Sequence, residues 1–143
     1  FNDYPKLLEP ILNNQTNFVL GSRHKTLNPY KMRVMKSSPI KAILLNFGHV
    51  VIQKIFNLLY SQNTTDIGTM YKVFKKECLK DIKLVKNRFD FDIELVCKLV
   101  KHGNKPFEVQ INYTSRGWDQ GKKYSIFRDT PGVLWTLIKT KFE

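Results

Sequence analysis

Three glycine-containing segments of this chain place cationic or hydroxyl side chains beside backbone that a ligand can approach closely. They are Gly21-Ser22-Arg23, the segment from Asp66 to Phe74 and the segment from Glu108 to Lys123. Glycine has no Cβ and so permits close approach, while arginine and lysine bind phosphate oxygens. Together the three segments predict a site for an anion, and phosphate is the anion we expect.

The same segments, in this order, resemble the second half of the family 2 glycosyltransferases that act on polyprenyl phosphates, the dolichyl-phosphate mannose synthase type. In that family a strand ends in Gly-Ser-Arg, Asp-x-x-x-x-Tyr-Lys-Val-Phe follows a long helix, and Glu-Val-Pro-Ile-x-Tyr-x-x-Arg runs into Glu-Gly-Lys-Lys. This chain has Asp66-Ile-Gly-Thr-Met-Tyr-Lys-Val-Phe and Glu108-Val-Gln-Ile-Asn-Tyr-Thr-Ser-Arg at the matching places. Gln110 replaces the usual proline and Gln120 the usual glutamate. Otherwise the resemblance covers nearly the whole chain.

The resemblance implies the C-terminal, acceptor-side half of a GT-A fold, without the nucleotide-binding half that carries an Asp-x-Asp metal motif. No Asp-x-Asp precedes Gly21, and the chain begins at Phe1. The complete enzyme would be an inverting hexosyltransferase that moves a sugar from a nucleotide-sugar to dolichyl or undecaprenyl phosphate. It would use Mg²⁺ or Mn²⁺ held by the missing half, with no metal bound by this fragment. We expect the fragment alone to be inactive.

The resemblance also assigns roles to individual side chains. Arg23, with Ser22, is the first candidate for the acceptor phosphate, the alternative being a strand-end arginine in solvent. Asp66 is the acidic residue expected near the sugar and acceptor, and it could orient the sugar or Lys72, because an ionised phosphate needs no strong base. Asp92 and Glu94 resemble an acidic pair at a helix start, although helix capping explains them equally well. The remaining phosphate-binding candidates are Arg33, Lys72, Arg116, Lys122 and Lys123.

Composition leaves other functions open. The chain has 143 residues and a net charge of +12, with no acidic residue from Pro10 to Thr65. A charge of this size suits nucleic acid, an anionic membrane or phosphorylated ligands, or is simply a solvated lysine-rich surface. A non-enzymatic basic module that binds nucleic acid or anionic lipid is therefore the alternative. The aromatic residues mostly occupy periodic, buried-type positions, which disfavours nucleic acid.

Location is inferred from cysteines and apolar runs. Cys78 and Cys97 lie in apolar helical patterns without metal-site spacing, so we expect buried, reduced thiols and a cytosolic environment. No run of about eighteen apolar residues and no signal peptide is visible. Membrane contact is therefore expected to be peripheral, at the cytoplasmic face.

The periodicity predicts one α/β domain over residues 1–143, a mixed sheet flanked by helices. The helix Ile40–Tyr60 has apolar residues on more than one face, which favours burial on two sides over burial on one side and lipid or partner contact on the other. His49 has no carboxylate or second histidine near it in sequence, so we expect an ordinary core or surface histidine. The remaining elements are expected as a helix from Pro5, a strand at 18–20 ended by Gly21, a loop at 24–39, a strand at 70–75, a helix at 77–82, a helix capped by Asp90 or Asp92 and ended by Gly103, a strand at 107–113 and a helix at 131–142.

Overall fold

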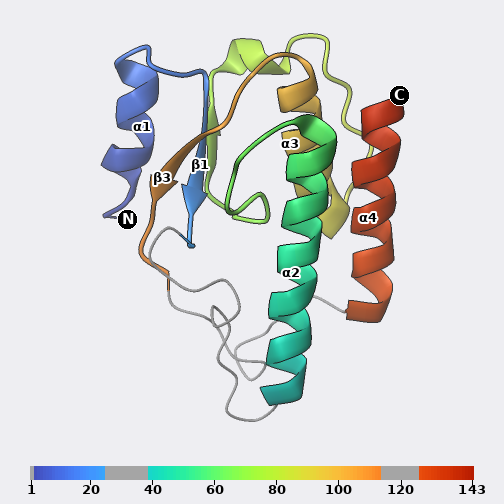
Figure 1. The fold of residues 1–143 in the computed structure, drawn as a ribbon. Helices are drawn as coiled ribbons and strands as arrows, with labels where there is room; N and C mark the ends of the chain where they lie inside the picture. The colour runs from blue at the N-terminus through green and yellow to red at the C-terminus, as the bar shows by residue number, and fades with distance from the viewer. Residues whose placement is uncertain (1, 25–38, 114–125) are drawn as a thin grey trace.

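The computed structural model describes residues 2–24, 39–113 and 126–143, with side chains in the last range from Asp129 onward. Helices and strands alternate along these ranges (Figure 1). In order, the elements are α1 (Tyr4–Leu12), β1 (Phe18–Ser22), α2 (Pro39–Tyr60), β2 (Lys72–Phe74), the 3₁₀ helix η2 (Lys76–Leu79), α3 (Phe89–Lys101), β3 (Phe107–Gln110) and α4 (Ile126–Phe142).

The three strands form one mixed sheet in the order β2-β1-β3. The central strand β1 is antiparallel to β2, with Val19 opposite Val73, and parallel to β3, with Val19 opposite Phe107. All five residues of β1 are buried, as expected for a central strand covered on both faces. The predicted α/β class and mixed sheet flanked by helices are confirmed.

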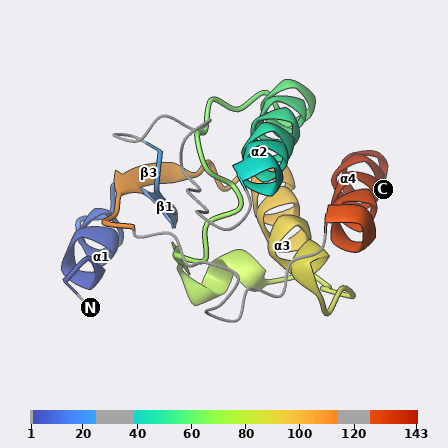
Figure 2. The same cartoon turned by 90° about the horizontal axis from the view of Figure 1, so that it is seen from below.

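Helices cover the two faces of the sheet unequally. On one side α1 packs through Leu7 against Val19 and Ile111. On the other side α2, α3 and α4 enclose a larger core that includes Phe18, Leu20 and Phe56. Figures 1 and 2 show this layering, with α1 on one side of the sheet and the three longer helices on the other. Because side chains alternate along a strand, neighbouring residues of β1 serve both cores.

Several predicted boundaries were wrong. The strand expected at 107–113 ends at Gln110, and Phe107, expected on the buried face, is 44% exposed because it lies at the sheet edge. The last helix begins at Ile126 and contains Pro131, since a proline in the second turn removes only one backbone hydrogen bond. The segment expected as a helix at 77–82 is the short 3₁₀ helix η2.

Helix α3 begins differently from the prediction. Its N-cap residue is Arg88, which makes no side-chain capping bond, and Asp90 and Asp92 lie inside the first turn. Neither aspartate caps the helix, although both remain close to its positive end. The predicted stop is confirmed, because Gly103 has a φ of +86° just beyond the helix, a conformation that glycine adopts easily.

Two predictions about burial had different outcomes. Cys78 and Cys97 are free, buried thiols, as predicted, and burial raises the pKa of Cys97 to about 12. By contrast, α2 is long and apolar enough to cross a membrane by length and composition, with a mean hydropathy of 1.5. The expectation that no such stretch exists was therefore wrong, although a helix in a soluble core can meet the same criterion.

Gly21 of β1 lies against Tyr71, just before β2, and Ile111, just after β3. A Cβ at this position would lie 2.7 Å from the Cβ of Tyr71 and 2.9 Å from Cγ2 of Ile111. The backbone amide of Gly21 also donates to the carbonyl of Tyr71 at 2.8 Å. The glycine is required here because the neighbouring segments of the chain leave no room for a methyl group.

We predict that Gly21→Ala lowers the free energy of unfolding by about 1–3 kcal/mol, because overpacking forces the neighbouring segments of the chain apart. Gly48→Ala is the control, since a Cβ at Gly48 meets no atom within 4 Å and alanine favours the helix by about 1 kcal/mol. Chemical denaturation of both variants checks this. Equal stability of the two variants would contradict the packing argument.

Candidate functional site

The site lies at one edge of the sheet, where segments distant in sequence meet. Because β1 and β3 are parallel, their carboxyl ends lie at the same edge, and the antiparallel β2 begins there. Arg23 and His24 directly follow β1, Asp66 precedes β2, and His49 comes from α2. This edge of the sheet brings together groups from three separate segments.

A buried ion pair between Arg23 and Asp66 forms the centre of the site. The guanidinium Nε donates to Oδ2 at 2.6 Å and Nη2 donates to Oδ1 at 2.7 Å. The backbone amide of Arg23 also donates to Oδ2, at 3.1 Å. The two side chains are only 9% and 0% exposed. The two candidates for separate roles in binding and chemistry are therefore direct partners.

The ion pair sets the pKa values of both groups. Burial alone would raise the pKa of Asp66, but Arg23, with smaller effects from His49 and His24, holds it below its ordinary value. Burial alone would lower the pKa of Arg23, whereas Asp66 and Tyr113 raise it above its ordinary value. Both groups are therefore ionised at neutral pH, each stabilised by the other.

Two histidines complete the surroundings of Asp66. Nε2 of His49 lies 3.6 Å from Oδ1, and Nε2 of His24 lies 3.9 Å from Oδ2. The imidazole rings are 4.7 Å apart between centroids. His49 has neither group near it in sequence, but folding brings both beside it, because β1 and the turn before β2 pack against α2. Leu45, His49 and Gln53 are four residues apart and so lie on one face of the helix, which could have indicated that His49 faces inward.

His24, His49 and Asp66 could offer ligands to a metal, since one atom from each lies within 4.8 Å of the others. Both carboxylate oxygens of Asp66, however, already accept from the guanidinium of Arg23. A divalent cation there would face a positive charge at short range, with no further anionic ligand among the three residues. The arrangement is thus better suited to orienting Arg23 than to holding a metal.

Lys72 and Asp92 form a second ion pair beside the first. Nζ of Lys72 lies 3.4 Å from Oδ1 of Asp92 and also donates to the carbonyl of Thr69. The Lys72 side chain is 5% exposed. Burial lowers its pKa, while Asp92 and the more distant Asp66 oppose that change. The structure therefore brings Lys72 and Asp92 together near Arg23 and Asp66.

Glu94 lies elsewhere, although only two residues separate it from Asp92. Its carboxylate accepts from the backbone amides of Val85 and Lys86 and pairs with Nζ of Lys98 at 2.8 Å. Burial by itself raises the pKa of Glu94, but Lys98 and the two amides lower it below its ordinary value. The geometry gives Glu94 the task of fixing the segment before α3 to that helix.

The turn that carries Asp66 is held by Glu108 of β3, a contact that the sequence did not indicate, and by Ser22 of β1. Oε1 of Glu108 accepts from the backbone amides of Thr65 and Asp66 at 2.7 and 3.0 Å. The hydroxyls of Ser22 and Thr65 share a hydrogen bond of 2.6 Å. Ser22, predicted to bind phosphate, is fully buried and positions this turn.

The α2 side holds the same turn through Gln53. Its side-chain amide nitrogen donates to the carbonyl oxygen and hydroxyl of Thr64, each at 2.8 Å. Its side-chain oxygen accepts from the backbone amide of Ile67 at 2.9 Å. A glutamine in an apolar helix is a sequence signal for such a buried contact, because a buried polar group needs a partner.

The remaining candidates for phosphate binding lie outside the described residues: Arg33, Arg116, Lys122 and Lys123. Tyr113 is the last described residue before Arg116 in the sequence, and the Arg23 guanidinium lies over its ring at 5.1 Å from the centroid. This contact places the end of the segment after β3 beside the Arg23–Asp66 pair.

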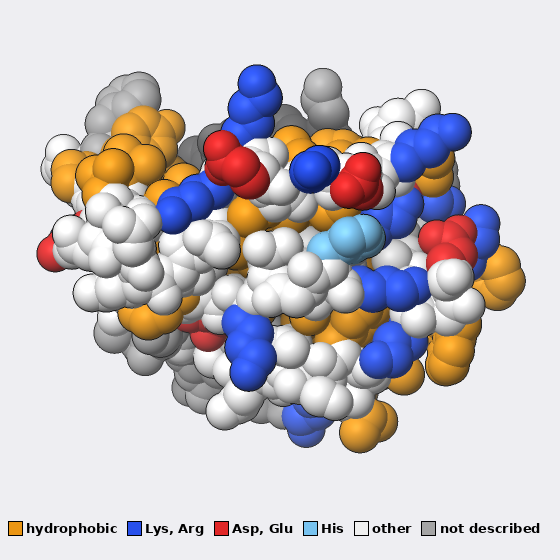
Figure 3. Space-filling model, turned by 90° about the horizontal axis from the view of Figure 1, so that it is seen from above, with side chains coloured by type: hydrophobic (Ala, Val, Ile, Leu, Met, Phe, Trp, Pro, Cys, Tyr) orange, Lys and Arg blue, Asp and Glu red, His pale blue; other side chains and the backbone are white. Residues whose placement is uncertain are grey.

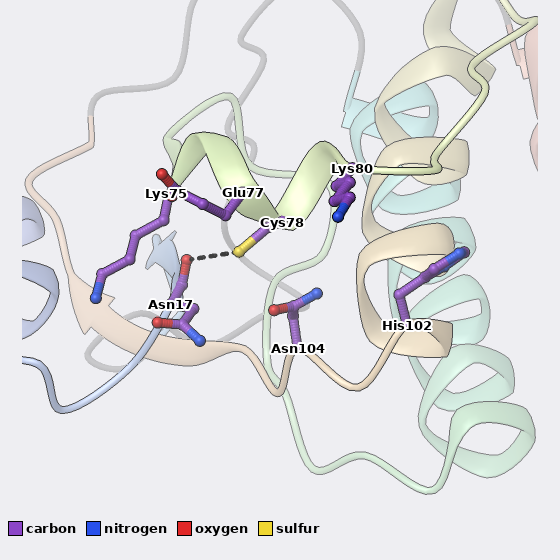
Figure 4. A pocket seen from close by; sticks show the side chains of 7 residues that line it. All are labelled: Asn17, Lys75, Glu77, Cys78, Lys80, His102 and Asn104. Carbon is purple, nitrogen blue, oxygen red and sulfur yellow. Dashed lines mark hydrogen bonds between the residues drawn. The ribbon is translucent and has the colours of Figure 1, made fainter.

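A surface hollow of about 560 Å³ lies away from this site. Figure 4 shows its lining, which includes Asn17, just before the amino end of β1, and Cys78, whose thiol donates to the carbonyl of Asn17 at 3.5 Å. Its lining contains none of the side chains of the site around Arg23 and Asp66. The upper face of the molecule carries lysines and arginines scattered among acidic and apolar groups rather than in one patch (Figure 3).

Comparison with known proteins connects the chain to one enzyme class. It is 25% identical over 114 residues to glycosyltransferase AglJ of Haloferax volcanii. The match covers 80% of this chain but 34% of AglJ, so the chain spans about a third of that relative. No family model and no solved structure matches. The chain is distantly similar to a glycosyltransferase.

We predict that Asp66→Asn lowers the free energy of unfolding by about 3–5 kcal/mol at pH 7, because it leaves Arg23 buried without a carboxylate. The folded pKa of Asp66 lies below its unfolded value, so its stabilising effect is present above about pH 4 and is lost as the pH falls further. Denaturation at several pH values should show that the free energies of unfolding of Asp66→Asn and of the unmodified protein become more similar in acid.

Asp90→Asn is the matched control, since Asp90 makes only a partly exposed pair with Lys86, and such pairs contribute about 0–1 kcal/mol. If the free energies of unfolding of Asp66→Asn and of the unmodified protein differed by the same amount from pH 7 to pH 3, the ion pair of Asp66 would not be the source of the stability.

Proposed function

We propose that this chain is the acceptor side of a family 2 glycosyltransferase of GT-A type, which transfers a sugar from a nucleotide-sugar to a polyprenyl phosphate with inversion. The observation that carries the proposal is the pairing of Arg23 with Asp66 and of Lys72 with Asp92 at one edge of the sheet. Similarity to a glycosyltransferase over most of the chain supports the same class.

The chemistry of the acceptor explains why such a site is suitable. A phosphate monoester is already ionised near neutral pH, so its attack on a sugar carbon needs positioned cations more than a strong base. Asp66 contacts Nε and Nη2 of Arg23, and the guanidinium has five N–H donors in all. The edge not taken by Asp66 can therefore donate to phosphate oxygens.

In this mechanism Asp66 is a positioning residue rather than a base. It holds the guanidinium in one orientation, which reduces the ordering that binding would otherwise require. Asp92 has the corresponding role for Lys72, holding a desolvated ammonium group at the start of β2. A phosphate between the two cations would meet two fixed positive charges, each aligned by its own acid.

The donor must come from outside these 143 residues. AglJ is about three times as long as the matched part of this chain, which leaves room for a nucleotide-binding half in proteins of this kind. We propose that this half binds the nucleotide-sugar and a divalent metal, Mg²⁺ or Mn²⁺, which would stabilise the departing nucleotide phosphate. Because a polyprenyl phosphate resides in a bilayer, the enzyme would act peripherally at the cytoplasmic face of a membrane.

We predict that Lys72→Gln in the full natural polypeptide lowers kcat/KM for polyprenyl phosphate by roughly tenfold to a hundredfold, since a charge-assisted contact contributes about 1.5–3 kcal/mol. The KM of the nucleotide-sugar should change little. Steady-state transfer of a labelled sugar measures both. The matched control is Lys98→Gln, which removes another ion-paired lysine at Glu94 and should leave transfer within about twofold.

Equal losses in the two lysine variants would show that Lys72 acts through folding alone. Failure of the unmodified enzyme to glycosylate any polyprenyl phosphate, across the common nucleotide-sugars and with Mg²⁺ or Mn²⁺ present, would refute the proposed function.

A further inference from the structure

His24 and His49 are titratable side chains beside the Arg23–Asp66 pair, and the proposed function gives them no role. Their rings lie 4.7 Å apart between centroids, with 34° between the ring planes. Nε2 of each ring faces the Asp66 carboxylate, at 3.6 Å for His49 and 3.9 Å for His24. The two side chains are only 10% and 2% exposed. The histidine pair is therefore a buried, titratable unit against the centre of the site.

Gly68 shows how near the His49 ring comes to the Arg23 guanidinium. A Cβ at Gly68 would lie 3.5 Å from Cε1 of His49 and 3.8 Å from Nη2 of Arg23. Both side chains thus border the same glycine. A phosphate bound by Arg23 would act on the histidine pair at short range, through a buried region where screening by salt is weak.

The described charges around the site do not by themselves favour a doubly charged ligand. The cations are Arg23 and Lys72, and the carboxylates are Asp66, Asp92 and Glu108, which accepts from the backbone amide of Asp66. Two positive and three negative charges leave a net charge of −1 while both histidines are neutral. A phosphate monoester has a second pKa of about 6, so it is mostly a dianion at pH 7.5. Its binding calls for additional positive charge.

The other described groups near the pair do not supply that charge. Tyr113, which borders Arg23, adds a phenol and no cation. The remaining ionisable side chains of the helices around the site lie in solvent or have partners of their own. Lys41 and Lys54 of α2 are exposed, Glu94 pairs with Lys98, and Asp129 pairs with Arg88.

We propose that the His24–His49 pair takes up one proton when the acceptor phosphate binds, and so supplies the positive charge that the described site lacks. The proton comes from the solvent and adds to one imidazole nitrogen, and no other bond changes. Imidazole ordinarily titrates near pH 6.5, and a nearby anion favours its charged form. The inference rests on the proposed function, because the ligand that drives the uptake is the acceptor phosphate.

The geometry limits the uptake to one proton. Two imidazolium rings 4.7 Å apart would repel each other, so the pair titrates as one unit and accepts a second proton only with difficulty. Once one ring is charged, Asp66 balances two cations instead of one, and the net charge of the described site rises from −1 to 0. His24 and His49 are thus positioning residues, which act on the phosphate through Asp66 and Arg23.

Calorimetry of acceptor binding measures the proton uptake. The full natural polypeptide, in the absence of sugar donor, is titrated at pH 7.5 with geranyl phosphate, a water-soluble prenyl phosphate, in Hepes and in Tris. These buffers differ in their heat of ionisation, so the difference in binding enthalpy counts the protons taken up. We expect an uptake of about one proton, and a Kd that rises by up to about tenfold from pH 7.5 to pH 8.5.

A double variant tests whether the histidines hold that proton. His24→Gln with His49→Gln removes both imidazoles but keeps polar side chains. It should lose the uptake, and its Kd should change by less than about twofold over the same pH range. His102→Gln is the matched control, since His102 is exposed at the end of α3 and lines the hollow away from the site. This control should keep the uptake of the unmodified polypeptide, and thermal melts check that both variants fold.

Nuclear magnetic resonance of the histidine rings observes the proton in the unmodified polypeptide, so the test stays decisive if the double variant unfolds. With ¹⁵N-labelled histidine, the ring signals of His24 or His49 should move toward imidazolium values when geranyl phosphate is added at pH 7.5. The signals of His102 should not move. The single variants His24→Gln and His49→Gln assign the signals.

Three results would overturn the proposal. The unmodified polypeptide binds geranyl phosphate without proton uptake, as expected if cations outside the described residues supply the charge; the folded double variant keeps the uptake, which would place the proton on Lys72 or on the ligand; or neither ring signal moves. Binding without uptake leaves the proposed function standing, whereas failure to bind the prenyl phosphate at all counts against both.

Discussion

The buried ion pair between Arg23 and Asp66 is the constraint on which the rest of the site depends. Two charges removed from water are tolerated only when their geometry is good and their remaining bonds are satisfied. Asp66 must therefore be held at a fixed place at the end of β1. Glu108 from β3 and Gln53 from α2 provide that fixation by binding the turn from two sides.

The same requirement explains the unusual character of α2. A helix that must direct Gln53 and His49 inward cannot use those positions for the apolar core, and Phe56 and Tyr60 supply that packing in its second half. The apolar residues on its outer side, such as the exposed Phe47, then contribute little to the stability of the domain.

Two acid–lysine pairs show how chemically similar residues acquire different roles. Asp92 and Glu94 are two residues apart on α3, which places them about 200° apart around the helix. Asp92 thus meets Lys72 at the start of β2, while Glu94 meets Lys98 and the backbone before the helix. A family resemblance that treats them as a pair cannot distinguish these two environments.

Local sequence was enough to predict the α/β class, the long helix ending at Tyr60 and the buried strand at Phe18–Leu20, and to mark Arg23 and Asp66 as candidates for the site. These depend on local periodicity and on motifs that lie within a few residues of each other. The folded chain was needed to see that Arg23 and Asp66 bind each other and that His24 and His49 flank them. It also decided that Glu108 fixes the turn and that the apolar side of α2 faces outward. Such contacts join residues about 17 to 43 positions apart in the sequence. Which side of a helix or strand meets them is settled by packing, which local sequence does not encode.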